Sequence, residues 1–261
     1  MGKLIFLYLI GGLFWGAWGL DLHGFTIGIT DDGSEWPPYT YYQRVDGKPS
    51  TEIVGFSVDV ITEILGREGI DFKIQLLPWK RAQAEVEDGS EFQMFLSGSW
   101  SEERALKYYI SHPYYSTSGY YFYSKTKFPE GLSVNNLDDI KKYSIAGLAG
   151  HSYADYGIAS SEIYQGTNSY SALIGQILLG RYDIFLESLE IIAGYSTITE
   201  NVLDNPDLAY VKVPGMKTVE FYMMFTKNEV GLELKKVVDK GLREMKETGR
   251  LTELLKKYIP E

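Results

Sequence analysis

Short apolar runs of strand length alternate with segments of helical spacing along the first part of the chain. Residues 25–29, 72–76 and 92–96 have the length and composition of buried strands. Between them, Ser57 can cap a helix, and residues 79–88 form a second helical segment that Gly89 closes. Repeated strand–helix units of this kind predict a parallel sheet covered by helices.

The same alternation begins again after an aromatic, β-prone stretch at 120–123. Strands are expected at 144–148, at 182–186 and around Val211 and Val213, and helices at 153–160, after Ser169, through Ile191 and Ile192, and over 230–258 with a break near Gly249. Residues 220–225 are again apolar and extended. The strand–helix alternation therefore occurs in two blocks, which two extended segments join. This arrangement predicts an α/β chain with two lobes, between which the chain crosses twice.

We expect residues 20–121 with 223–261 to form one lobe and residues 122–222 to form the other. Each lobe would hold an open, mostly parallel sheet with helices. Open α/β sheets bind ligands beyond the carboxyl ends of their strands, so two facing sheets predict a ligand cleft that a hinge can close. The hinge rotation is expected in the extended segments 120–123 and 220–225.

The first 19 residues have the pattern of a secretory signal peptide. Lys3 precedes an uncharged apolar run at 4–15, and Ala17 and Gly19 place small residues at a cleavage site. The alternative is an uncleaved membrane anchor, but the run is short for a bilayer span. No cysteine follows it, so attachment through a lipidated cysteine is excluded. We therefore expect a periplasmic protein that is cleaved near Gly19.

Composition narrows the chemistry further. The chain has no cysteine, which excludes disulfides and thiolate zinc sites, and its three histidines lack metal-ligand spacing. Asp31 and Asp32 could contact a cation, but an acidic loop of this kind is usually a solvated turn. With a formal net charge of −10, the chain is a poor candidate for binding nucleic acid or an anionic membrane surface. We expect no metal, no cofactor and no nucleic-acid partner.

A series of short motifs in fixed order gives a more specific indication. The motifs are Trp36-Pro37-Pro38-Tyr39, Gly55-Phe56-Ser57-Val58-Asp59-Val60, Pro78-Trp79, Ser97-Gly98-Ser99-Trp100-Ser101-Glu102-Glu103-Arg104, Ile110-Ser111-His112-Pro113-Tyr114, Ala149-Gly150-His151-Ser152-Tyr153 and Gly180-Arg181-Tyr182-Asp183. In this order and spacing, the chain resembles the family 3 extracellular solute-binding proteins, which serve polar amino-acid importers in bacteria. The resemblance covers nearly the whole chain after residue 19.

The resemblance implies a two-lobed, type II periplasmic-binding-protein-like fold. It also implies that the cleft closes on a small polar ligand, an amino acid or a related carboxylate. The partner would then be the membrane permease of an ABC importer. We expect the protein itself to be a monomer.

Arg104 is the first candidate for ligand contact, because the matching arginine in the family grips the ligand carboxylate. A planar guanidinium offers two parallel donors to a carboxylate, so the chemistry fits. The alternative is a surface ion pair with Glu102, Glu103 or Asp88. Ser97 and Ser99 can complete the hydrogen bonds of the carboxylate, or serve as turn and capping residues.

Three aromatic residues, Trp36, Tyr39 and Trp79, are candidate walls of the ligand site. Matching aromatics in the family sandwich the ligand side chain. As large aromatic residues they can instead belong to the core. Arg81, on the helix after Trp79, can add a second positive contact or lie in solvent as an ordinary helix charge.

On the second lobe, His151 and Ser152 lie at a predicted strand-to-helix turn, whose backbone amides suit an anion. Amino-acid binders in the family often place an aspartate five residues after the counterpart of Asp183, and here that position is Ser188. Glu187 is adjacent, so we expect it to accept the ammonium group of the ligand. If it does not, the ligand lacks an α-amino group.

Two other functions stay open at this point. Some relatives on this scaffold are periplasmic dehydratases that act on prephenate or arogenate, and Glu187 could donate the proton if burial raised its pKa. The sequence shows one such acid and no assembled catalytic group, so we expect a protein that is not an enzyme. A ligand-sensing module for a membrane receptor is the third reading, and it would need a second chain for signalling.

Overall fold

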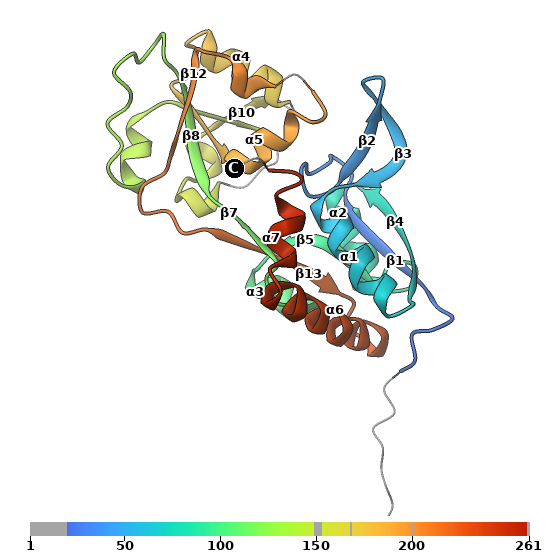
Figure 1. Cartoon of the computed structure of the whole chain (residues 1–261). Coiled ribbons are helices and arrows are strands. Elements are labelled where there is room, and N and C mark those ends of the chain that lie inside the picture. The colour runs from blue at the N-terminus through green and yellow to red at the C-terminus, as the bar shows by residue number, and fades with distance from the viewer. Residues whose placement is uncertain (1–19, 149–152, 168, 200, 260–261) are drawn as a thin grey trace, which may run out of the picture.

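The structure is a computed structural model, and it describes residues 20–148, 153–167, 169–199 and 201–259. Two mixed sheets form the centres of two bodies, which a narrow connection joins (Figure 1). Within the described ranges, no helix combines the length and the apolar character needed to cross a bilayer. The predicted leader, residues 1–19, lies outside the described residues.

The first sheet has the strand order β4-β1-β5-β13-β6, and β7 pairs with β13 off this path. The bounds are β1 Thr26–Asp32, β4 Asp71–Leu77, β5 Met94–Ser99, β6 Tyr109–Ile110, β7 Tyr115–Thr117 and β13 Val219–Phe225. Helices α1 (Phe56–Arg67), α6 (Glu229–Glu247) and α7 (Arg250–Leu255) pack on one another, and α2 (Trp79–Asp88) packs on β1 and β5. β1 is parallel to β4 and β5, whereas β13 is antiparallel to β5.

The second sheet has the strand order β10-β9-β11-β8-β12. Its bounds are β8 Gly119–Ser124, β9 Ile145–Leu148, β10 Tyr164–Thr167, β11 Ile184–Ser188 and β12 Leu208–Lys212. β9 is parallel to β10 and β11, and β8 is antiparallel to β11 and β12. Helix α4 (Tyr170–Leu178) packs on β9 and β11, and α5 (Leu189–Tyr195) follows β11 directly. The α/β class and the two-sheet architecture are confirmed, but both sheets are mixed rather than mostly parallel, because β8 and β13 pair antiparallel with their neighbours.

Local capping accounts for several helix ends that the sequence predicts. The hydroxyl of Ser101 accepts a hydrogen bond of 3.2 Å from the amide of Arg104 at the start of α3 (Glu102–Lys107). Ser169 does the same for α4. Gly249, with a φ of 77°, separates α6 from α7, since a residue in this left-handed conformation ends the helical hydrogen-bond pattern.

Several parts of the chain differ from the sequence prediction. The short strands β6, β7 and β10 were not predicted, and Ser57 lies inside α1 instead of capping it. The helix expected at 153–160 is replaced by 3-10 turns at Ala154–Tyr156 and Ser160–Glu162, because Gly157 takes a left-handed φ of 66° after the first turn. The hairpin of β2 (Tyr41–Val45) and β3 (Lys48–Val54) was not predicted. Further 3-10 turns span Leu137–Lys142 and Val202–Asp204.

The chain leaves the first sheet at Ser118 and returns to it over residues 213–218. The pairs Thr117–Val219 and Tyr120–Lys212 flank these two segments, which therefore lie side by side. The stretches 120–123 and 220–225 are inside β8 and β13, so they are regular ladder strands rather than free connections. The lobe boundaries expected after residues 121 and 222 fall inside the same two strands.

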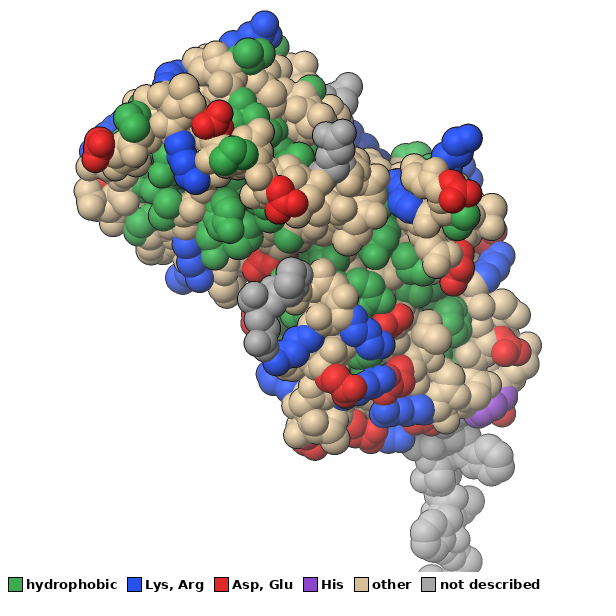
Figure 2. Space-filling model, turned by 45° about the horizontal axis from the view of Figure 1, so that its top comes forward, with side chains coloured by type: hydrophobic (Ala, Val, Ile, Leu, Met, Phe, Trp, Pro, Cys, Tyr) green, Lys and Arg blue, Asp and Glu red, His purple; other side chains and the backbone are tan. Residues whose placement is uncertain are grey.

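Aromatic packing continues from the first sheet toward the crossing. Tyr115 stacks on Tyr39 at 3.8 Å and on Phe221 at 4.7 Å between ring centroids. All three belong to one buried or half-buried cluster that also includes Ile191 and Ile192 of α5. On the surface, acidic and basic side chains are mixed over the lower body rather than gathered in one patch (Figure 2).

Candidate ligand-binding site

A cavity of 630 Å³ lies between the two sheets. The carboxyl ends of β1, β5 and β11 reach it, as expected for open α/β sheets. The side chains and backbone that line it are Asp31, Asp32, Ser34, Trp36, Pro78, Trp79, Lys80, Ser97, Ser99, Arg104, Thr117, Gly119, Tyr153, Asp155, Tyr156, Leu186, Glu187, Ser188, Met216, Val219 and Phe221. Of the residues that the sequence singled out, six are therefore brought together here: Trp36, Trp79, Ser97, Ser99, Arg104 and Glu187.

Arg104 lies in α3 and is held beside the cavity by hydrogen bonds to Ser99, the last residue of β5. Its Nη1 donates to the backbone oxygen of Ser99 at 2.7 Å and to the hydroxyl of Ser99 at 2.8 Å. Its guanidinium carbon lies 5.4 Å from the ring centroid of Trp79. Burial lowers the pKa of Arg104, but a guanidinium keeps its charge in proteins.

No carboxylate in the described part of the chain forms an ion pair with Arg104. The surface pair with Glu102 or Glu103 is therefore not formed, and Glu103 pairs with Lys107 instead. A half-buried guanidinium without a carboxylate partner among the described residues can bind an anion, and a carboxylate matches its planar donors.

The aromatic side chains of Trp36 and Trp79 line the cavity. Trp79 packs edge to face on Phe95, with 5.2 Å between centroids, and Trp36 lies 6.2 Å from Phe221. Tyr39 does not join them: it is fully buried and stacked on Tyr115, so its role is in the core. The expectation that Tyr39 forms a wall is therefore corrected.

Arg81 also does not reach the cavity. Its side chain is 63% exposed and pairs with Glu85 at 3.1 Å, one helical turn along α2. Lys80 lines the cavity instead. Adjacent helical residues point about 100° apart, so the direction of α2 decides which of the two cations faces the ligand site.

Glu187 is the last residue but one of β11 and lines the cavity from the second sheet. Its carboxylate accepts a hydrogen bond from the buried hydroxyl of Tyr170 and one of 2.7 Å from the amide of Ser188. Burial raises the pKa of Tyr153, Tyr156 and Tyr170, and the charge of Glu187 raises it further. These hydroxyls remain protonated at neutral pH and can act as donors. His151 and Ser152 lie outside the described residues.

Asp31 is a residue of this site that the sequence interpretation missed. It lies within β1, fully buried, and accepts hydrogen bonds from the hydroxyl of Ser97 at 2.8 Å and from the amide of Asp32 at 3.0 Å. Burial raises the pKa of Asp31 to about 6, against the opposing effect of these hydrogen bonds. The sequence did hold a sign of this role, because Asp31 is an acidic residue just beyond the apolar run that predicted the first strand.

The charges around the cavity are unequal. Four carboxyl groups line it (Asp31, Asp32, Asp155 and Glu187), against the two cations Lys80 and Arg104. In the part of the chain that the structure describes, no cluster of three histidine, aspartate or glutamate side chains is arranged to hold a metal ion. The cavity therefore suits an organic ligand that carries an anionic group at Arg104 and a cationic group near the carboxylates.

Comparison with known proteins finds similar chains among binding proteins. The L-cystine-binding protein TcyA of Bacillus subtilis (strain 168) is 23% identical over 236 residues, which cover 90% of this chain and 82% of that protein. Two solved structures align over 90% of this chain. The arginine-, lysine-, histidine-binding protein ArtJ of Geobacillus stearothermophilus matches with a TM-score of 0.66 and 23% identity, over 96% of that chain. A histidine-bound ABC uptake substrate-binding protein of Streptococcus pneumoniae matches with a TM-score of 0.68 and 20% identity, over 93% of that chain.

The sequence model of one protein family matches residues 26–261, which is all of the two-sheet region. The expected type II fold is confirmed by the solved structures. The expectation of a binding protein rather than an enzyme is confirmed by the family. The chain belongs to the bacterial extracellular solute-binding proteins, family 3.

Proposed function

We propose that this protein captures a free amino acid in the cavity between its two sheets and delivers it to the permease of an ABC importer. One observation carries the proposal: Arg104 and Glu187 line the same cavity from opposite sheets, and Arg104 has no acidic partner among the described residues. A zwitterion satisfies both groups at once, because its carboxylate and its ammonium group carry the complementary charges.

Arg104 would hold the ligand carboxylate, with the hydroxyl of Ser99 beside it. Glu187 would accept the ammonium group in an orientation that the hydrogen bond from Tyr170 maintains. Trp36 and Trp79 would flank the ligand side chain, because both line the cavity. Ser97 would act indirectly, since its hydroxyl donates to Asp31. His151 and Ser152, outside the described residues, stay candidates for ligand contact on sequence grounds.

The excess of carboxyl groups bears on the class of ligand. A dicarboxylate would bring two negative charges into a cavity with four carboxyl groups, and like charges at short range oppose binding. A neutral or cationic amino acid adds no such repulsion. We therefore place zwitterionic and basic amino acids ahead of dicarboxylates and of prephenate.

The lobes would divide where the chain crosses, at Ser118 and within 213–218, and the two short segments would absorb the hinge rotation. Their flanks are fixed by ladder pairs on both sides, so rotation concentrates in them. The ligand would shift the protein toward the closed form only through contacts that the open form lacks. As an exported protein, the chain would be cleaved near Gly19 and act in the periplasm.

A thermal-shift screen tests this function. The panel is the common amino acids with L-cystine, succinate and prephenate. At 100 times its dissociation constant, a ligand stabilises the native state by about 2.7 kcal/mol, which is roughly 5–10 °C for a protein of this size. We expect a shift of this order with at least one amino acid and none with succinate. A shift with succinate or prephenate alone would contradict an amino-acid ligand, and a panel without any shift would contradict the proposed function.

A further inference from the structure

One wall of the cavity is a loop with a strained residue in it. Asp32, Ser34 and Trp36 line the cavity, whereas Glu35 between them does not. Glu35 has a φ of 65°, in the left-handed region that side chains other than glycine seldom occupy. Such a conformation persists only where the surroundings hold it.

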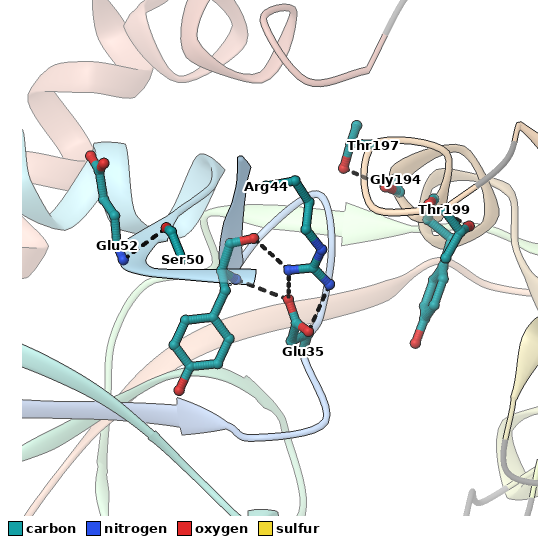
Figure 3. Close-up of polar contacts among 9 residues, drawn as sticks. Glu35, Arg44, Ser50, Glu52, Gly194, Thr197 and Thr199 are labelled. Carbon is teal, nitrogen blue, oxygen red and sulfur yellow. Dashed lines mark hydrogen bonds and ion pairs between the residues drawn. The ribbon is translucent and has the colours of Figure 1, made fainter. Parts of the chain in front are cut away.

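The surroundings of Glu35 supply several hydrogen bonds. Arg44 donates to the two carboxylate oxygens of Glu35 through Nη1 and Nη2, at 2.9 Å each, and the amide of Tyr42 donates at 2.9 Å (Figure 3). Arg44 also donates to the backbone oxygen of Tyr42 at 2.7 Å. The side chains of Glu35 and Arg44 are each only 15% exposed. Glu35 is thereby fixed to β2 of the hairpin.

Trp36 follows Glu35 directly, so its position depends on the backbone that the ion pair holds. Its amide donates to the backbone oxygen of Thr40 at 2.7 Å, and the amide of Thr40 donates back to Trp36 at 2.9 Å. The indole nitrogen of Trp36 is buried and has no hydrogen-bond partner among the described residues. The Thr40 bridge and the Glu35–Arg44 pair thus both hold the loop around Trp36.

We propose that the Glu35–Arg44 ion pair is a positioning pair for ligand binding, which maintains the left-handed backbone at Glu35 and so holds Trp36 against the cavity. Neither side chain of the pair lines the cavity, so the pair acts on the ligand only through the loop. The effect on Trp36 is independent of the ligand, whereas the effect on affinity rests on the proposed function.

A matched ion pair elsewhere in the same body separates positioning from general stabilisation. Arg250 of α7 contacts Glu63 of α1 at 2.9 Å, with side chains 31% and 20% exposed. The Arg250–Glu63 pair ties two helices together and has no residue in the cavity lining. Arg250 also pairs with Glu253 at 2.7 Å, so Arg250→Ala removes two ion pairs without disturbing the loop.

The experiment is fluorine NMR of the full chain labelled with 5-fluorotryptophan, without ligand. Single Trp→Phe variants assign the resonances of Trp36, Trp79 and Trp100. We expect Arg44→Ala to shift or broaden the resonance of Trp36 and to leave that of Trp100 in place. Arg250→Ala should leave both unchanged. A Trp36 resonance that is the same in Arg44→Ala as in the parent chain would overturn the proposal.

A pair of variants at Glu35 tests the role of the backbone. Glu35→Ala and Glu35→Gly both leave Arg44 without its partner, but only glycine adopts a φ of 65° readily. We expect Glu35→Gly to keep the Trp36 resonance closer to that of the parent chain than Glu35→Ala does. The opposite order would show that the ion pair does not act through the left-handed backbone.

Ligand affinity completes the test, with the amino acid that gives the largest thermal shift as the probe. We expect Arg44→Ala to weaken binding about tenfold or more, because a displaced contact residue commonly costs at least this much, and Arg250→Ala to change it little. If no amino acid binds, the proposed function fails while the fluorine result still decides the positioning role. Equal affinities of Arg44→Ala and the parent chain would contradict the role of the pair in binding.

Discussion

The hydroxyl of Ser97 donates a hydrogen bond of 2.8 Å to the carboxyl group of Asp31, where the neighbouring strands β5 and β1 end at the cavity. Asp31 is fully buried, and burial raises its pKa to about 6. The charge of this carboxyl group therefore changes as pH passes through about 6. The hydrogen bonds to Asp31 lower its pKa, but by less than burial raises it.

Asp31→Asn should flatten the dependence of stability on pH. The pKa of Asp31 is higher in the folded state than the ordinary value of 3.8, so its favourable contribution is complete below about pH 4 and is lost as pH rises through about 6. At 1.36 kcal/mol per pKa unit, the loss between pH 4 and pH 7.5 is at most about 3 kcal/mol. Urea unfolding of the parent chain and the variant at both pH values measures it.

The exposed Asp71 provides the control for this experiment. Asp71→Asn, at the start of β4, should leave the pH dependence of unfolding close to that of the parent chain. If Asp31→Asn loses as much stability with rising pH as the parent chain does, the carboxyl group of Asp31 is not the source of the effect.

Glu187→Gln should weaken amino-acid binding without loss of the fold. A hydrogen bond between charged partners contributes about 1.5–3 kcal/mol, so the dissociation constant should rise roughly 10- to 100-fold. Tyr170→Phe removes the hydroxyl that donates to Glu187, and the loss should be smaller, about tenfold. Titration calorimetry measures the dissociation constants of both variants.

Tyr164→Phe is the control, because Tyr164 is exposed and stacks on Tyr182 away from the cavity lining. Unchanged affinity in Glu187→Gln would remove Glu187 from the site.

Gly194→Ala should destabilise the contact between α5 and the loop that carries Trp36. A β-carbon at Gly194 would lie 2.4 Å from the carbonyl carbon of Pro37 and 2.4 Å from the nitrogen of Pro38, closer than atoms can pack. Overpacking of this kind costs about 1–3 kcal/mol. Gly175→Ala in α4 meets no atom within 4 Å and should instead stabilise by up to about 1 kcal/mol. Urea unfolding of the two variants should give opposite signs, and two equal results would exclude the close contact at Gly194.

The strand–helix alternation predicted the α/β class and the two sheets, and the ordered motifs indicated several residues of the cavity. Both signals depend on the local spacing of residues. Arg104 was identified within a motif that resembles the family's, and Glu187 as the neighbour of Ser188, the position at which the family often has an aspartate. Asp31 was missed because the first strand was predicted to end at residue 29. Pairing with β4 extends β1 to Asp32, where Asp31 faces Leu76, and that partner lies far along the chain.

The direction in which a side chain points was harder to predict from the sequence than the element on which the residue lies. The direction of α2, fixed by the contact of Trp79 with Phe95, turns Lys80 rather than Arg81 to the cavity. Tyr39 belongs to a predicted aromatic motif, but its ring stacks on Tyr115 from a distant strand. Neither fact has a local signal in the sequence, because each depends on how separate elements pack.

The most direct test of the central claim is a calorimetric comparison of Arg104→Ala with Arg81→Ala, using the amino acid that gives the largest thermal shift. The two variants each remove one arginine, but Arg81 is exposed and pairs with Glu85, whereas Arg104 lines the cavity. Arg104→Ala should weaken binding at least about 100-fold, as expected for loss of a bidentate charged contact, and should leave urea unfolding within about 1 kcal/mol of the parent chain. Arg81→Ala should bind like the parent chain. An Arg104→Ala protein that binds the amino acid with parental affinity would contradict the account.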